Sequence, residues 1–280
     1  MKFTAFGLAR SGTTALAQLL NSHPEVFCAI EAFLPDKSIA DLPLPESLLE
    51  PDVVGQKRAI KHAAIITSKH KCFGNKFPRY YGYLDDVSSN CIPNIGIYRE
   101  GFSFAHSWNE RVRAKENWPQ GRTGIIGIIE QVILLISLAK LKNTDSTYIF
   151  SYERLLRIDK EHFTEVFKLL DVDPELARNR FESQVFNRKK ISEVKRTFTE
   201  NEARAKDYFD IEKVDILLKN NSGISISSYS TDALDSLSLL KVKLESFIQE
   251  FSGTFSDLEV QYLKSQLPFF EHAIKEKLYF

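Results

Sequence analysis

Apolar and polar residues are arranged along the first 170 positions so that strands and helices are expected in turn. Short runs rich in β-branched or aromatic residues indicate strands, and apolar residues at helical spacing indicate helices. The expected strands are Lys2–Gly7, Asn94–Tyr98 and Thr147–Tyr152. The expected helices are Thr13–Leu20, Gly101–Trp118, Thr123–Lys142 and Asp159–Leu170, the last with Asp159 as its N-cap. This alternation is typical of an α/β fold with a parallel sheet.

The pattern becomes mainly helical after about residue 190. Capping-box sequences begin at Thr199 and Ser256, and Gly223–Ser230 is expected to be a loop or a short strand. We therefore expect a single domain over residues 1–280, with an α/β core in 1–190 and a helical part in 191–280. The helical part would pack on the sheet or form a homodimer contact.

The charge balance excludes a protein that is basic everywhere. The 280 residues hold 37 Lys and Arg against 37 Asp and Glu, which argues against a nucleic-acid-coating protein. One segment departs from this balance, because Val53–Leu84 contains no Asp or Glu and seven Lys or Arg residues. These charges belong either to a solvated helix face or to an anion-binding region.

The cysteines and the hydropathy of the chain narrow the class of protein further. Three widely spaced cysteines, Cys28, Cys72 and Cys91, indicate buried free thiols and favour neither a disulfide framework nor a metal site. The most apolar stretch, Gly124–Leu141, contains Glu130, which favours a buried helix over a membrane span. No apolar leader segment is visible, so we expect a cytoplasmic protein.

The strongest local motif follows the first expected strand. Gly7–Thr14 fits the phosphate-loop pattern G-x-x-x-x-G-K-S/T, except that Thr13 stands where the lysine belongs. Backbone N–H groups at the start of the following helix, together with the helix dipole, favour an anion there. Without the lysine the loop is poorly equipped for a triphosphate, and Arg10 is the cation that the loop offers instead. A plain glycine-containing turn before a helix is the alternative.

Arg10-Ser11-Gly12-Thr13-Thr14 resembles the loop K/R-S/T-G-T-T of sulfotransferases that use 3′-phosphoadenosine 5′-phosphosulfate (PAPS). In that family the loop holds the 5′-phosphosulfate. An arginine at a strand end and a serine eight residues later hold the 3′-phosphate, and Arg99 and Ser107 match them. The resemblance implies a three-layer, phosphate-loop-like α/β fold with a central parallel sheet flanked by helices.

Three further segments agree with the resemblance, in the expected order. They are Ser22–Glu31, Asn75–Pro78 and Phe150–Leu155, which resemble segments of tyrosylprotein sulfotransferases and their bacterial relatives. The chain departs from the family at Glu100-Gly101, where an Asp or Asn and then a Pro are usual. The family's C-terminal donor-binding segment is only weakly visible, at Asn187–Lys190.

The resemblance also implies roles for single residues. Glu31 is the expected general base, while Glu25 is a lower-ranked base and His23 is a base or, alternatively, a cap or packing residue. Arg10 and Lys76 are the expected catalytic cations, although Glu31 could be a surface or ion-paired residue and Lys76 one more member of the basic run. The expected donor-binding residues are Arg10, Ser11, Gly12, Thr13, Thr14, Arg99, Ser107 and Arg188. Trp108 could stack on adenine, but a core position is the simpler interpretation.

The function expected from this resemblance is sulfuryl transfer from PAPS, without a metal, to a hydroxyl or amine of a glycan or small molecule. Two other functions remain open. A small-molecule kinase with a phosphate loop would bind ATP and Mg²⁺, and a non-catalytic relative would bind nucleotide without transfer.

Overall fold

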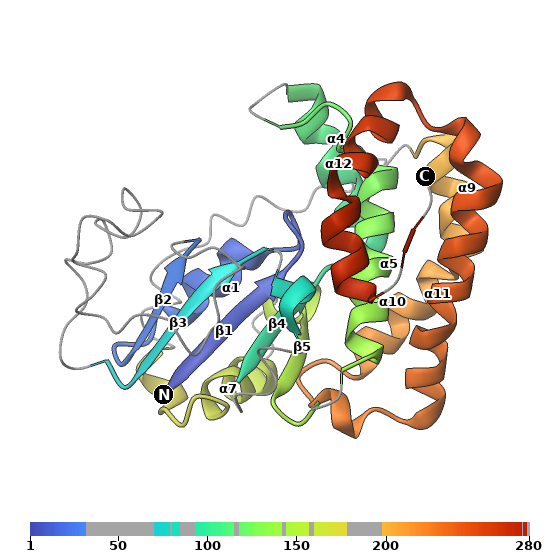
Figure 1. Cartoon of the computed structure of the whole chain (residues 1–280). Coiled ribbons are helices and arrows are strands. Elements are labelled where there is room, and N and C mark those ends of the chain that lie inside the picture. Colours follow the sequence, from blue (N-terminus) through green and yellow to red (C-terminus); the bar gives the residue numbers. More distant parts are fainter. Residues whose placement is uncertain are drawn as a thin grey trace. The chain divides into compact units, whose positions relative to one another are not determined.

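Within the described part of the chain, five parallel strands form a single sheet in the order β2-β3-β1-β4-β5 (Figure 1). The strands are β1 (Lys2–Gly7), β2 (Val26–Ile30), β3 (Cys72–Phe77), β4 (Asn94–Tyr98) and β5 (Thr147–Ser151). The structure, a computed structural model, describes residues 1–31, 70–78, 80–84, 93–114, 118–141, 144–156, 160–177, 198–275 and 277–278. The expected α/β fold with a central parallel sheet flanked by helices is confirmed.

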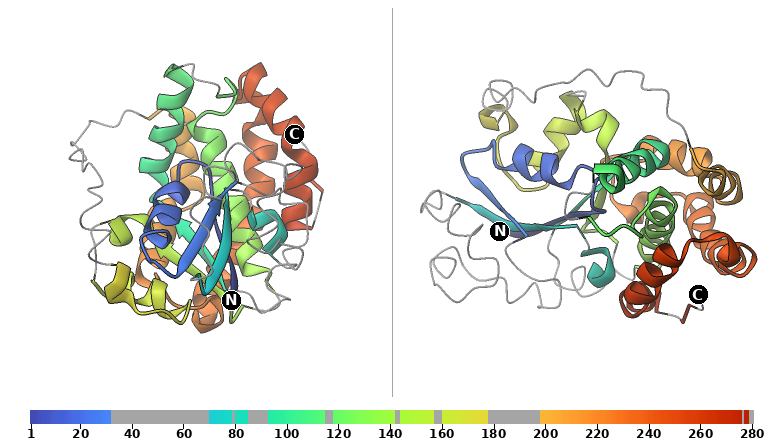
Figure 2. Two further views of the ribbon diagram at one scale, coloured as in Figure 1. Left: turned by 90° about the vertical axis from the view of Figure 1, so that its left-hand side faces the viewer. Right: turned by 90° about the horizontal axis from the view of Figure 1, so that it is seen from above.

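The described residues divide into two units. The first comprises Met1–Tyr98, Lys142–Val194 and Ser222–Ser228, and it contains the sheet. Its helical segments are α1 (Thr13–Leu20), η3 (Tyr80–Tyr83), α6 (Tyr152–Leu156), α7 (Lys160–Lys168) and η4 (Ile226–Ser228). The right-hand view of Figure 2 shows α1 on one side of the sheet and η3 on the other. The segment at Gly223–Ser230 is attached to β5 by an isolated bridge between Tyr148 and Ser225 and by the Gly223 N–H, which donates to the Ile149 carbonyl at 2.8 Å.

β1 lies at the centre of the sheet because its side chains are almost entirely apolar. Phe3, Ala5 and Phe6 are all fully buried, as expected of a parallel strand covered on both faces. Its one buried hydroxyl, Thr4, donates to Asn94 at 2.8 Å, and Asn94 donates in turn to Thr147 at 3.3 Å. This chain of hydrogen bonds crosses three strands in register and satisfies the buried polar groups.

The second unit is helical and comprises Arg99–Leu141, Lys195–Asn221 and Tyr229–Phe280. Its segments are α4 (Gly101–Ala114), α5 (Gly124–Ala139), α9 (Glu200–Tyr208), α10 (Ile211–Asn220), α11 (Thr231–Phe251), η5 (Ser252–Thr254) and α12 (Asp257–Ile274). Both expected capping boxes are present, at Thr199–Glu202 and Ser256–Glu259. Capping explains why α9 and α12 begin where the sequence indicates.

α4 and α5 belong to this helical unit, although the sequence places them in the α/β part at residues 1–190. The reason lies in α5, whose residues are buried from Gly124 to Leu138. A helix that is apolar on every side needs cover on every side. α4, α9, α11 and α12 of the same unit contact it and supply that cover.

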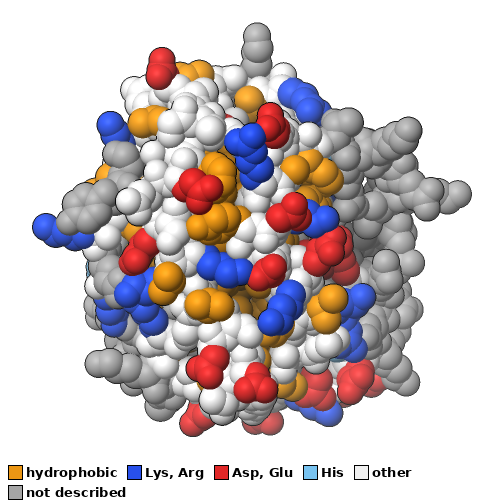
Figure 3. Space-filling view, turned by 90° about the vertical axis from the view of Figure 1, so that its right-hand side faces the viewer, with side chains coloured by type: hydrophobic (Ala, Val, Ile, Leu, Met, Phe, Trp, Pro, Cys, Tyr) orange, Lys and Arg blue, Asp and Glu red, His pale blue; other side chains and the backbone are white. Residues whose placement is uncertain are grey.

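The exposed apolar side chains of the second unit are scattered. The large ones are Ile216, Leu239, Val242 and Leu258. Figure 3, seen from the side of α11, shows small apolar groups separated by acidic and basic side chains. A homodimer contact through these helices stays a prediction.

Candidate functional site

The loop between β1 and α1 is built around Ser11. The Ser11 N–H and hydroxyl both donate to the Leu8 carbonyl, at 3.0 and 2.8 Å. Arg10, just before it, is exposed and adopts a left-handed backbone conformation with a φ of 76°. Because Ser11 uses both donors inside the loop, we expect its side chain to shape the loop rather than donate to a ligand.

Gly12 is the position at which the loop requires glycine. Its φ of 102° is a conformation that side-chain-bearing residues rarely adopt. A Cβ atom there would lie 2.3 Å from Cδ2 of Tyr152, the residue that follows β5 and begins α6. The Tyr152 ring therefore packs directly against the loop, and only a residue without a side chain fits beneath it.

α1 begins directly after Gly12, with Thr13 buried and Thr14 exposed in its first turn. The N-cap residue of this helix, Gly12, has no side chain with which to cap it. The first amides of a helix carry unsatisfied N–H groups and the positive end of the helix dipole, an arrangement suited to a phosphate or sulfate oxygen. The structure therefore brings Gly12, Thr13 and Thr14 together in the strand–loop–helix context that the motif requires.

Glu31 and Lys76 are joined twice at the ends of two neighbouring strands. The Glu31 N–H donates to the Lys76 carbonyl at 2.7 Å, and Lys76 Nζ donates to Glu31 Oε1 at 2.6 Å. The Lys76 side chain is 1% exposed and that of Glu31 is 31% exposed. Because the strands are parallel, this pair lies at the same sheet edge as the loop that follows β1. The edge thus holds a carboxylate, a buried ammonium and the loop that precedes the N-terminus of α1.

The described lysines of the acid-free run are each paired with a carboxylate. Lys71 Nζ lies 2.8 Å from Glu25 Oε1, and Lys76 pairs with Glu31 as described above. Both acids precede the run in sequence. Lys76 is therefore a buried, specifically paired lysine, not one member of a solvated face. Residues 53–69 and Arg79 lie outside the described residues.

His23 is a structural residue. Its Nδ1 accepts from the Glu25 N–H at 3.0 Å, and its Nε2 lies 2.9 Å from the Asp173 carbonyl. The network thus assigns the neutral form protonated on Nε2. Burial lowers the pKa of His23 below the ordinary value of 6.5, against the opposing effect of the Asp173 carbonyl. With both nitrogens engaged, the ring is a cap and packing residue, and the assignment of a base role to His23 is not supported.

We expect the stability of the protein to fall as the pH drops below about 6.5, in part through His23. The unfolded chain then takes up a proton on His23 more readily than the folded protein, because the folded pKa is lowered. The free energy of unfolding, measured with urea from pH 7.5 to 5.0, should decline less steeply in His23→Gln. Equal slopes for wild type and His23→Gln would contradict this assignment.

Arg99 directly follows β4, and the start of α4 after it is tied to two other helices of the second unit. Gln131 Nε2 of α5 donates to the Arg99 carbonyl at 2.8 Å. The Gly101 N–H donates to both carboxylate oxygens of Asp215, at 3.2 Å each. Asp215 of α10 therefore caps α4 from outside.

Ser107 lies two helical turns beyond Arg99, on α4. Ser103, on the same side one turn earlier, donates to Glu100 at 3.3 Å. The hydroxyl proton of Ser103 is thus used locally. Arg99 and Ser107 belong to the second unit.

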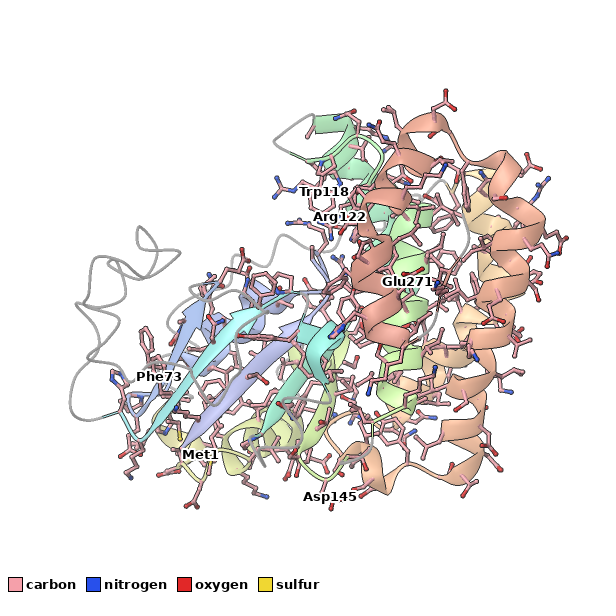
Figure 4. The ribbon with its side chains drawn as sticks, viewed as in Figure 1. Met1, Phe73, Trp118, Arg122, Asp145 and Glu271 are labelled. Atoms are coloured by element: carbon pink, nitrogen blue, oxygen red, sulfur yellow. The ribbon has the colours of Figure 1, made fainter. Side chains whose placement is uncertain are left out.

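Trp108 is a core residue, as the simpler interpretation holds. It forms part of a charged cluster with Arg122 and Trp118, which are labelled in Figure 4. The Arg122 guanidinium lies 4.3 Å from the centre of the Trp108 ring and 4.5 Å from that of Trp118. It also bonds to the fully buried Glu130, which accepts a hydrogen bond from the Tyr262 hydroxyl. The stacking offsets part of the cost of burying the ion pair, and the cluster fixes α4, α5 and α12 to one another.

Other expectations fall partly outside the described residues. Arg188, expected at the donor, and Cys91 lie there, whereas Cys28 and Cys72 are buried free thiols. Burial raises the pKa of Cys28 to about 12. In the described ranges, His, Cys, Asp and Glu side chains do not gather in groups of three or more that could hold a metal. Among the described helices, none has the length and apolar character needed to cross a membrane.

Comparison with known proteins gives a limited result. No protein-family model matches the chain, and no curated protein does. Among solved structures it is similar to the crystal structure of the mouse sulfotransferase SULT7A1 complexed with PAP. The two share 15% sequence identity at a TM-score of 0.48, over 79% of this chain and 89% of that chain.

Several residues around the expected site could not be found from the sequence. The supports of α4, Gln131 and Asp215, come from helices 30 or more residues away in sequence, and no local pattern announces them. The pairing of Lys76 with Glu31 was also not expected, because it joins residues 45 positions apart. The only signal for it was indirect: a run of lysines needs carboxylates from elsewhere.

Proposed function

We propose that this protein is a sulfotransferase that transfers the sulfuryl group of PAPS to a hydroxyl or amine of a carbohydrate or small molecule. The observation that carries the proposal is the sheet edge of the first unit. There, a phosphate loop without its lysine lies at the same edge as a carboxylate bonded to a buried ammonium. This set suits transfer of an anionic group to an acceptor that must lose a proton.

The proposed donor contacts follow from the chemistry of each group. The amides of Gly12, Thr13 and Thr14 would bind the 5′-phosphosulfate, and Arg10 would neutralise charge on the departing phosphate. Arg99 and Ser107 would bind the 3′-phosphate, and Arg188 is proposed as a further donor contact. The 3′-phosphate contacts would separate PAPS from other adenine nucleotides.

In the proposed reaction the acceptor oxygen or nitrogen attacks sulfur while its proton passes to Glu31. The bond between sulfur and the 5′-phosphate oxygen breaks as the new bond forms, and adenosine 3′,5′-bisphosphate (PAP) leaves with the electron pair. By analogy with phosphoryl transfer, such a reaction depends mostly on alignment and charge neutralisation. Glu31 is suited to the base role because it is partly exposed and held in place at both its backbone and its side chain.

A thermal-shift comparison tests the proposal against the kinase alternative. PAP should raise the melting temperature in metal-free buffer, and ATP with Mg²⁺ at the same concentration should raise it much less. Ligand at about 100 times its dissociation constant stabilises a protein by about 2.7 kcal/mol. The opposite ranking would favour a kinase and refute the sulfotransferase proposal.

An assay of sulfuryl transfer separates an enzyme from a protein that only binds the nucleotide. Labelled PAPS and a panel of sugar, amine and small-alcohol acceptors should give a sulfated product with at least one acceptor class. Binding of PAP without transfer to any acceptor would favour the non-catalytic alternative.

A further inference from the structure

Gln131 is a buried amide of which only one end is satisfied. The residue is 1% exposed, and its Nε2 donates to the Arg99 carbonyl at 2.8 Å. Its Oε1 is buried as well, and the described residues offer it no hydrogen-bond donor. Exchanging the two ends would place Oε1 against the Arg99 carbonyl, so the amide orientation follows from its partner.

The surroundings of Gln131 leave the start of α4 little freedom. A Cβ atom on Gly101 would lie 2.6 Å from Cγ2 of Ile211 and 3.3 Å from Oε1 of Gln131. The same glycine donates its N–H to Asp215. α5 thus holds the carbonyl before α4, and α10 holds the first amide of α4. The backbone that carries the Arg99 side chain is therefore fixed on two sides.

Stability gives glutamine no net advantage at this position, because its Nε2 satisfies the Arg99 carbonyl while its Oε1 is left unsatisfied, and the two effects oppose each other. An unsatisfied buried amide oxygen costs the free energy of its lost hydration, whereas an apolar side chain of the same length has no such cost. The remaining α5 neighbours of Gln131 are apolar and buried, apart from Glu130 of the Arg122 cluster. The one thing that glutamine provides and methionine does not is the hydrogen bond to Arg99.

We infer that Gln131 is a positioning residue that sets Arg99 for recognition of the 3′-phosphate. This inference rests on the proposed function, in which Arg99 binds that phosphate. A carbonyl held at 2.8 Å fixes the backbone from which the guanidinium extends. A bidentate guanidinium contact depends on orientation, so a loosened backbone should weaken 3′-phosphate binding and spare the 5′ end.

Gln131→Met tests the inference with two separate measurements. Calorimetry in metal-free buffer gives the affinities for PAP and for adenosine 5′-monophosphate (AMP), which lacks the 3′-phosphate. The preference for PAP should fall at least tenfold in the variant, while AMP affinity stays within about twofold. The melting temperature should change little, because removal of the unsatisfied Oε1 offsets the loss of the hydrogen bond to the Arg99 carbonyl. Gln131→Leu should show the same changes in affinity and melting temperature. Gln249 is exposed, so Gln249→Met is the matched control and should leave both affinities unchanged.

A purely structural role of Gln131 would lower the melting temperature of both variants and weaken the affinities for PAP and AMP equally. That result would overturn the inference. The same affinities measured for the wild type and for Arg99→Ala separate a failure of the proposed function from a failure of the inference about Gln131. If the wild type does not prefer PAP over AMP, the proposed function fails and the inference with it. If Arg99→Ala loses the preference but Gln131→Met keeps it, only the inference fails.

Discussion

Replacing Glu31 by glutamine should lower kcat for sulfuryl transfer by about 10²–10⁴-fold, the usual contribution of a general base. The amide keeps the size of the side chain and an oxygen toward Lys76, but it cannot take a proton from the acceptor. Affinity for PAP should stay within about twofold, because Glu31 is proposed to act on the acceptor and not on the donor. Initial rates with labelled PAPS and calorimetry with PAP measure the two effects separately.

The nearby Glu25 supplies the matched control for this prediction. It is the lower-ranked carboxylate, and it pairs with Lys71, which is mostly exposed. Exposed pairs of this kind contribute little, so Glu25→Gln should retain both turnover and stability. Near-normal turnover in Glu31→Gln would show that the base lies elsewhere, and a matching loss in Glu25→Gln would shift the role to that residue.

Glu31→Gln should also destabilise the protein, because it removes the partner of Lys76. A double variant separates this loss of stability from the loss of turnover. Glu31→Gln leaves an ammonium that is 1% exposed without its counter-charge. We expect the free energy of unfolding to fall by about 3 kcal/mol, the low end for a broken buried pair, because Glu31 is itself partly exposed. Glu31→Gln with Lys76→Met removes both charges and should recover most of that loss. The double variant should still be inactive, which separates catalysis from folding.

The beginning of the fold could be predicted because its signals are local. β1, the loop and α1 occupy consecutive residues, and the loop motif is recognisable only in that strand–loop–helix context. The same holds for the N-termini of α9 and α12, where four residues contain the whole capping interaction. Local hydrogen bonds of this kind leave a pattern in the sequence.

β2 and β3 were missed as strands for the opposite reason. Val26–Ile30 is only five residues of unbroken apolar character, and Cys72–Phe77 interrupts its apolar residues with glycine, asparagine and lysine. These segments are strands because they pair with each other and with β1, some 40 to 70 residues away. β3 accommodates Lys76 and Asn75 only because Glu31 and Tyr80 bond to them. Such pairings are not visible within a sequence window.

The zero net charge hides an unequal distribution, as the acid-free run indicates. Residues 198–280 hold 14 Asp and Glu against nine Lys and Arg, so the rest of the chain has the opposite excess. The proposed function requires cationic groups for a donor with several negative charges. The excess of acids in the C-terminal helices is therefore compatible with a cationic site formed from residues earlier in the chain.

Replacing Gly12 by alanine should weaken PAP binding by about 100-fold, which corresponds to about 2.7 kcal/mol. Two effects add. A φ of 102° costs a side-chain-bearing residue about 1–3 kcal/mol, and the new Cβ would lie 2.3 Å from the Tyr152 ring. The loop or the ring must move, and the amides that begin α1 lose their arrangement. Calorimetric titration with PAP measures the effect.

The contribution of the collision with the ring can be separated from that of the backbone. Gly253→Ala is the matched control, because its Cβ would meet nothing within 4 Å, and it should bind PAP as the wild type does. Tyr152→Leu removes the ring atoms that the new Cβ would strike. Combined with Gly12→Ala, it should recover the steric part of the loss and leave the cost of the left-handed backbone. A Gly12→Ala variant with wild-type affinity would place the donor away from this loop, since no anion held by the first amides of α1 could be indifferent to the change.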